Sequence, residues 1–452
     1  MSGFAADSRQ ILKLAWPALI GQLSVVAFAT VDTLLLGRQS AVDLAALAVG
    51  GAVYMTIYVA LVGVVLAVGP IAGQLYGADR LEDAGAQLHQ SVWLALLLSV
   101  PGCLLLWLPW PFLVLADASP AVEFKVREYL AMLSLAVAPS LLFTVFRGFS
   151  TAVSRPKAVM VLQLVGLSAK VPLAIVLVQG HAASGLPALG VAGCAISSVI
   201  AFWLQALLAW QLLRRDPFYD RFALRGRGLH RPDRAALKAL LVLGLPIGGS
   251  LLIGISCFTL MAIFIARMGT APVAGHQIAI NLVSLLFMVP WAMAQASSTL
   301  VAQHVGAAEL PAARRVGWHG VELGLLTATA LGGGVYLLRK PLIALYTHDA
   351  TVAAVALSLL AWVVLFHIAD AAQALASSIL RAWKITTVPM LIYVAALWGV
   401  GLGGGSLLGF DILGGTPDAL RGAPGYWAAA TGGFVISGIA MCSLLAWTTR
   451  QR

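Results

Sequence analysis

Long apolar segments separated by short polar ones run through the whole chain. A helix that crosses a bilayer needs roughly 20 mainly apolar residues, and this rule predicts twelve membrane-spanning helices. Pro70 and Pro290 lie inside two of the longer segments, where we expect a kink or a tilt. The predicted spans cover about 11–36, 44–73, 88–114, 127–151, 156–180, 187–213, 239–266, 272–303, 316–338, 350–379, 386–409 and 424–447.

One long polar stretch, residues 214–238, separates the first six spans from the last six. We therefore predict an N-lobe at 1–213, a basic cytoplasmic linker at 214–238 and a C-lobe at 239–452. The predicted fold class is an all-α membrane protein with two six-helix lobes.

The two halves align with each other without a gap. Pro17 corresponds to Pro246, and Q-L-Y-G-A at 74–78 corresponds to Q-H-V-G-A at 303–307, both at an offset of 229 positions. Because each half has an even number of spans, both halves enter the membrane the same way round. The sequence therefore predicts a parallel internal repeat, which is one architecture of secondary transporters.

The composition excludes most soluble classes of protein. Apolar residues make up 60% of the 452 residues and charged residues 10%, whereas a soluble domain carries about 25% charged residues. A chain so poor in charge cannot cover a water-facing surface, which disfavours soluble enzymes and nucleic-acid-binding proteins. The net charge of +10 instead favours basic loops beside anionic membrane lipids, with no nucleic-acid partner.

The basic residues predict the orientation in the membrane. Of the 28 Lys and Arg residues, 19 lie in segments on the side of the N-terminus, 7 lie on the opposite side, and Arg147 and Lys170 lie within spans. Cytoplasmic loops carry the excess of Lys and Arg. We therefore expect both termini and the linker to be cytoplasmic.

Motifs of membrane-bound or soluble enzymes are absent from the sequence. It contains no H-E-x-x-H, G-x-S-x-G or P-loop pattern, and its four cysteines lie scattered without a C-x-x-C pair. We predict no catalytic residue, no metal site and no cofactor. A membrane enzyme and an ion channel are the weaker alternatives to a transporter.

Several segments resemble a known transporter family. They are W-P-A-L-I at 16–20, V-D-T-L-L-L-G at 31–37, G-Q-L-Y-G-A at 73–78, G-L-P-I at 244–247, M-G-T-A-P-V-A-G-H-Q-I-A-I-N-L-V-S-L-L-F-M-V-P at 268–290, I-A-D-A-A-Q at 368–373 and I-L-R-A-W-K at 379–384. With them the chain resembles the multidrug and toxic compound extrusion (MATE) family, and its NorM-like bacterial branch most of all.

The resemblance covers nearly the whole chain and implies its activity. It implies a monomeric antiporter of the bacterial inner membrane that exports amphipathic, cationic drugs against an inward flow of H⁺ or Na⁺. A flippase for lipid-linked or polyisoprenoid substrates is the alternative within the wider superfamily, and a more cationic cavity would distinguish it.

Ionisable residues inside apolar spans are the first candidates for the transport site, because a charge within a bilayer costs roughly 2.5 kcal/mol or more. Asp32, Lys170 and Asp370 lie in such contexts. Asp32 and Asp370 match the acids of the family's two lobes, and Gln277 and Asn281 form a polar stripe with Ser284 at helical spacing. We expect Asp32, Lys170, Asp370, Gln277 and Asn281 to bind the substrate or the coupling ion.

Aromatic and polar neighbours are weaker candidates for the lining of the cavity. They are Tyr54, Tyr58, Phe287, Phe366, His367 and Gln373.

Two departures from the family pattern bear on the coupling ion. Gly254 stands where the NorM-like pattern has a glutamate, and Lys170 stands where the family has an asparagine. Both changes disfavour a Na⁺ site. We expect Asp32 and Lys170 to form an ion pair within the membrane, because two opposite buried charges relieve each other's desolvation cost, and we expect H⁺ in preference to Na⁺ as the coupling ion.

The orientation can be tested by labelling with a membrane-impermeant maleimide. A cysteine introduced as Arg221→Cys, in the linker, should react in everted vesicles and stay protected in intact cells. Lys125→Cys, in a predicted outer loop, should show the reverse pattern. Labelling of the linker variant in intact cells would contradict the predicted topology.

Overall fold

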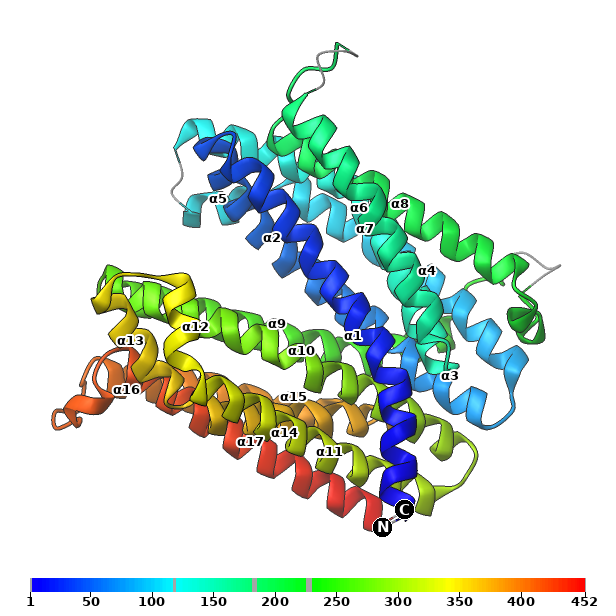
Figure 1. Cartoon of the computed structure of the whole chain (residues 1–452). Coiled ribbons are helices and arrows are strands. Elements are labelled where there is room, and N and C mark those ends of the chain that lie inside the picture. Colours follow the sequence, from blue (N-terminus) through cyan, green and yellow to red (C-terminus); the bar gives the residue numbers. More distant parts are fainter. Residues whose placement is uncertain (1, 117–118, 181–184, 225–229, 452) are drawn as a thin grey trace. The chain divides into compact units, whose positions relative to one another are not determined.

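The computed structural model describes residues 2–116, 119–180, 185–224 and 230–451, and within these ranges every regular element is a helix (Figure 1). Twelve of the described helical segments are long and apolar enough to cross a membrane, which confirms the number predicted from the sequence. They are Gly3–Gly37, Ala41–Gly77, Leu81–Trp107, Pro120–Ala152, Pro156–Gln179, Val191–Arg215, Arg234–Ala266, Thr270–Gly306, Leu310–Leu337, Val363–Ala382, Thr387–Gly409 and Ala423–Gln451.

The chain forms two compact units. The N-unit is Trp16–Gly248, and the C-unit combines Met1–Ala15 with Gly249–Arg452. These boundaries differ from the predicted lobe boundaries at 213 and 239 because two helices, α1 (Ser2–Gly37) and α9 (Arg234–Ala266), are each divided between the units. Hydropathy marks where the chain leaves the membrane, and does not mark which neighbours a continuous helix packs against.

The N-unit is built around α6, whose spanning window is 72% buried. Helices α2, α4 and α8 pack against α6, and its Leu141, Phe146 and Phe149 belong to the unit's largest cluster of buried apolar side chains. The unit contains α2 (Ala41–Val65), α3 (Val68–Gly77), α4 (Leu81–Trp107), α5 (Trp110–Ala116), α6 (Pro120–Ala152), α7 (Pro156–Gln179), α8 (Val191–Arg215), the 3-10 helix η2 (Pro217–Phe222) and parts of α1 and α9.

The C-unit is built around α14, whose spanning window is 78% buried. Helices α10, α11 and α17 pack against it. Between α15 and α16 the chain forms a π-helix, η3, in a glycine-rich segment. The unit contains α10 (Thr270–Gly306), α11 (Leu310–Leu337), α12 (Arg339–Tyr346), α13 (Ala350–Leu360), α14 (Val363–Ala382), α15 (Thr387–Val394), η3 (Ala395–Gly404), α16 (Gly405–Gly409), η4 (Asp418–Leu420), α17 (Ala423–Gln451) and parts of α1 and α9.

Ionic contacts hold the start of α1 within the C-unit. The Arg315 Nε donates to Asp7 Oδ2 at 3.1 Å, and the His319 Nδ1 lies 2.7 Å from the same oxygen. Asp7 is 6% exposed, although it is an acidic residue near the start of the chain. The corresponding part of α9 is held in the N-unit by apolar contacts, since Leu240, Leu243 and Ile247 cluster with Val64 of α2.

Two predicted spans have different bounds in the structure. The span predicted at 88–114 ends at Trp107, because Pro109 lacks an amide hydrogen and disfavours helical backbone at the preceding residue. The span predicted at 350–379 is two helices, α13 and α14, interrupted where the Trp362 amide donates to the Leu359 carbonyl. No proline or glycine marks this interruption.

The two predicted proline kinks have different outcomes. Helix α2 ends at Val65, and the helix resumes at Val68. A proline ring clashes with the carbonyl four residues before it, and for Pro70 this is the carbonyl of Leu66, inside the interruption. Helix α10 in contrast continues through Pro290 without a break.

Equivalent turns follow corresponding helices in the two halves. Asp79 and Ala308, 229 positions apart, have φ angles of +56° and +60°, although non-glycine residues rarely adopt this conformation. Three backbone amides close each turn in the same way. In the first turn Ala78, Asp79 and Arg80 donate to Gln74, Tyr76 and Leu75, and in the second Ala307, Ala308 and Glu309 donate to Gln303, Val305 and His304.

Hydrogen bonds join the C-terminal part of the predicted linker to α4. The Gln90 side chain donates to the Arg231 carbonyl at 2.9 Å, and the Trp93 Nε1 donates to the His230 carbonyl at 2.8 Å. Its residues 225–229, with two of its arginines, lie outside the described residues.

Candidate functional site

The first candidate site lies in the N-unit, where Asp32 of α1 meets Lys170 of α7. The Lys170 Nζ lies 2.7 Å from Asp32 Oδ2 and 2.9 Å from Ser198 Oγ of α8. Lys170 is 1% exposed and Asp32 is 4% exposed. The ion pair predicted from the sequence is therefore present, and it joins three helices.

The groups around the pair leave one oxygen of the carboxylate unused. Asp32 Oδ1 is buried and has no hydrogen-bond partner among the described residues. On the other side the Lys170 Nζ lies 4.7 Å from the centroid of the Phe28 ring, which is a cation–π contact. The ammonium group thus has three favourable partners, while the carboxylate keeps a free acceptor that a proton could occupy.

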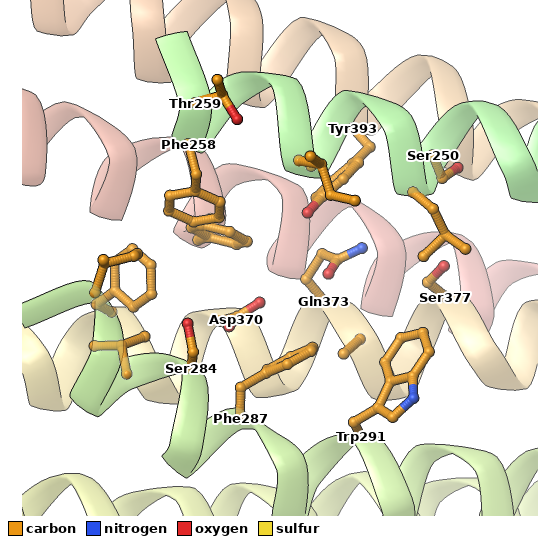
Figure 2. A pocket seen from close by; sticks show the side chains of 18 of the residues that line it. Ser250, Phe258, Thr259, Ser284, Phe287, Trp291, Asp370, Gln373, Ser377 and Tyr393 are labelled. Carbon is orange, nitrogen blue, oxygen red and sulfur yellow. The ribbon is translucent and has the colours of Figure 1, made fainter. Parts of the chain in front are cut away.

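The second candidate site is a cavity of about 410 Å³ within the C-unit. It is lined mainly by aromatic and aliphatic side chains, with a few polar groups that converge on it (Figure 2). Helices α9, α10, α14, α15 and α17 contribute the lining. The lining residues are Ser250, Leu251, Gly254, Ile255, Phe258, Thr259, Ile280, Val283, Ser284, Phe287, Trp291, Phe366, Asp370, Gln373, Ala374, Ser377, Arg381, Tyr393 and Phe434.

Asp370 is the one acidic residue among the described lining residues. It is 7% exposed, and Figure 2 shows it between Ser284 and Gln373 with the Phe287 ring beneath it. No hydrogen bond or ion pair joins its carboxylate to another residue in the described part of the chain. An unpaired carboxylate among aromatic rings is suited to an organic cation, which both the charge and the ring faces attract.

The predicted polar stripe on α10 lines this cavity only in part. Ser284 is in the lining, but the predicted residues Gln277 and Asn281 are outside it. Successive residues of a helix are turned by about 100°, so Asn281 points away from the face of Ile280. Asn281 Oδ1 instead accepts a hydrogen bond from the Tyr346 hydroxyl at 2.9 Å.

Among the weaker candidates, Phe287, Phe366 and Gln373 line the cavity. His367 does not; it is fully buried, and neither ring nitrogen has a partner among the described groups. Tyr54 and Tyr58 belong to the N-unit, where their rings stack at 5.4 Å between centroids, so they have no part in the cavity of the C-unit.

Tyr393 and Arg381 also line the cavity, although neither was predicted from the sequence as a lining residue. Tyr393 contacts the position of the missing glutamate, since a Cβ added at Gly254 would lie 3.2 Å from the Tyr393 hydroxyl. No periodic pattern marks Tyr393 in its span. The signal for Arg381 was available, because it lies in the resembling segment I-L-R-A-W-K.

Comparison with known proteins gives one family. The family model described as MatE matches residues 17–176 and again 246–405, so the two matches begin 229 residues apart, as the repeated residues do. The chain is 38% identical to a probable multidrug resistance protein NorM of Aromatoleum aromaticum, covering 96% of this chain and 92% of the relative. It is 32% identical to the multidrug resistance protein PmpM of Pseudomonas aeruginosa, covering 99% and 92%.

Solved structures agree with this fold. The Vibrio cholerae MATE transporter VcmN in its bent form superposes with a TM-score of 0.86 at 19% identity, covering 100% of this chain and 99% of that one. The eukaryotic MATE transporter AtDTX14 has the same TM-score at 17% identity and the same coverage.

The ion pair can be tested by a double-mutant cycle on thermal unfolding in detergent. Asp32→Asn and Lys170→Met should each lower the unfolding temperature, because the loss of one partner leaves a buried charge uncompensated at a cost of about 3–5 kcal/mol. The double variant should lose less than the sum of the single losses. Lys125→Met, which breaks the more exposed pair with Asp43, should have a smaller effect. Strictly additive losses would contradict a direct interaction.

Proposed function

The chain belongs to the MatE family, and on that premise we propose that it is a secondary active multidrug efflux transporter of the bacterial inner membrane. It exports amphipathic cations in exchange for protons by alternating access. It functions as a monomer surrounded by lipid, with both termini in the cytoplasm, and carries out no chemical reaction on its substrate.

The observation that carries this proposal is the unpaired carboxylate of Asp370 in an aromatic cavity. A buried charge without a partner is costly, and a cationic substrate would compensate it. Around it, Phe258, Phe287 and Phe434 supply apolar area without fixing the shape of a ligand. Such a site selects for charge and amphipathic character more than for a particular structure, as a multidrug transporter requires.

The Asp32–Lys170 pair supports coupling to protons. A Na⁺ ion needs several oxygen ligands, but here an ammonium group already occupies Asp32 Oδ2 and Ser198 Oγ. Protonation of Asp32 would remove its charge, weaken the pair and release α1 from α7. A pair with two such arrangements is the kind of two-state element that alternating access needs.

The described lining of the C-unit cavity contains no carboxylate other than Asp370, which also supports coupling to protons in preference to Na⁺. Gly254 lines the cavity opposite Tyr393, where the family pattern has a glutamate. A cation site that depends on two acidic side chains therefore lacks one of them.

The flippase alternative is less well supported. A pyrophosphate head group would require several basic residues, and the described lining contains Asp370 together with a single arginine. We therefore retain the export of amphipathic compounds as the proposed function.

Uptake of a fluorescent lipophilic cation into everted vesicles tests the transport and its coupling. A gradient with the vesicle interior acidic should drive uptake, and a protonophore should abolish it, because protons leaving the vesicle supply the energy. A Na⁺ gradient at constant pH should drive none. Uptake that follows the Na⁺ gradient and is insensitive to the protonophore would reject proton coupling, whereas no uptake under any gradient would reject the proposed function.

The role of Asp370 is tested by Asp370→Asn in the same vesicles and in binding assays with the purified protein. Loss of a charge-assisted contact of about 1.5–3 kcal/mol should weaken binding of the cation at least about tenfold. Glu322→Gln is the matched control, since Glu322 is an exposed acid of α11 in the same unit, outside the cavity lining. Full binding and export by a well-folded Asp370→Asn protein would contradict the assignment.

A further inference from the structure

The cavity of the C-unit contains a positive charge as well as a negative one. Asp370 and Arg381 both line it and both belong to α14. They are 11 positions apart, which in an α-helix corresponds to about three turns, roughly 16 Å along the axis, and a rotation of only about 20°. The two side chains therefore project from the same face of one helix. Because helical side chains lean towards the N-terminus, the Arg381 side chain is directed back towards Asp370.

Neither charge is neutralised by the protein. No acidic side chain forms an ion pair or hydrogen bond with the Arg381 guanidinium in the described part of the chain. The only described lining carboxylate is Asp370, which belongs to another turn of the helix. Tyr393 lies within electrostatic reach of both Asp370 and Arg381, and its neutral hydroxyl compensates neither. The cavity thus presents two separate charges of opposite sign, neither of them paired within the described residues, and its lining also includes aromatic rings.

Arg381 differs in this respect from the basic residue of the other unit. In the N-unit, the Lys170 ammonium is held by Asp32 and Ser198 and is almost fully buried. The guanidinium of Arg381 has no such partners among the residues that the structure describes, although it presents up to five N–H donors in a fork that matches a carboxylate. An anionic group that enters the cavity would find these donors unoccupied.

From this arrangement we propose that Arg381 is a specificity-determining residue that binds the anionic group of zwitterionic substrates. The inference rests on the proposed function, in which this cavity is the drug-binding site. The ammonium of a dipolar amphiphile lies at Asp370, its carboxylate lies at Arg381, and its aromatic scaffold contacts the rings of Phe287 and Trp291. A simple cation compensates Asp370 alone, so the cavity favours the zwitterion over a cation of the same size.

A pair of dyes that differ by one ethyl ester group, and therefore in charge, tests this proposal. Rhodamine 6G is an ethyl ester and a cation, and its free acid is a zwitterion at neutral pH. The dissociation constants of both dyes are measured by fluorescence polarisation on the purified protein, and the readout is the ratio of the two constants. Arg381→Gln should weaken binding of the free acid relative to the ester by about tenfold, the loss of one charge-assisted contact.

Two further variants separate specificity from folding and from general electrostatics. Arg381→Lys keeps the positive charge and should keep most of the preference for the free acid. Arg147→Gln removes an arginine of α6 in the N-unit, outside this cavity, and should leave the ratio unchanged. Each protein is checked by size-exclusion chromatography before the measurement.

The possible results are distinct. An unchanged ratio in a well-folded Arg381→Gln protein that still binds the ester would overturn the role of Arg381 while the proposed function stands. An equal change in Arg147→Gln would also overturn it, because the effect would then come from net charge alone. If the wild-type protein binds neither dye and takes up neither into everted vesicles under any gradient, the proposed function itself fails.

Discussion

A charge that is removed from water must be compensated, and the arrangement of both units follows from this constraint. Inside the membrane, a charged side chain can be compensated by an opposite charge of the protein or by the charge of a bound ligand. The N-unit takes the first course, with Asp32 and Lys170 at 2.7 Å. The C-unit leaves Asp370 without an ion-pair partner among the described residues that line its cavity. Two acids, one in each unit, thus have different local electrostatics. In the proposed function the first responds to a proton and the second to an organic cation.

The fold was largely predictable because bilayer thickness fixes the length of a spanning helix. That single constraint identifies the twelve spans, and the central polar stretch divides them correctly into six and six. What the sequence does not reveal is where a helix is interrupted without a proline, as at Ala361–Trp362, or where it widens into the π-helix η3. These irregularities are decided by the neighbours of a helix, and hydropathy contains no information about neighbours.

The charged residues of the candidate site were predictable, whereas the extent of its lining was less so. Asp32, Lys170 and Asp370 stand out because ionisable residues are rare and costly in apolar spans, and the pairing of the first two follows from opposite sign. The polar face of α10 was identified, but only Ser284 of its three residues reaches the cavity. Arg381 lies on the same face of α14 as Asp370, so its spacing gave a signal. Tyr393 comes from a different helix, whose orientation around its axis no single-helix pattern defines. To predict a lining that five helices form, the orientation of each helix around its own axis must be known.

The division of α1 between the two units has a consequence for biosynthesis. Residues Met1–Ala15 are synthesised before the N-unit, yet the rest of the unit to which they belong begins at Gly249. Asp7 therefore cannot form its contacts with Arg315 and His319 until most of the chain has been synthesised. Likewise, the N-unit is complete only when the start of α9, beyond the central linker, has been inserted and Leu240 has reached Val64. If the chain were cut at the linker, the first fragment would lack the start of α9, which belongs to the N-unit. The second fragment would lack the start of α1, which belongs to the C-unit. Although the sequence repeats, its halves are not independent folding modules.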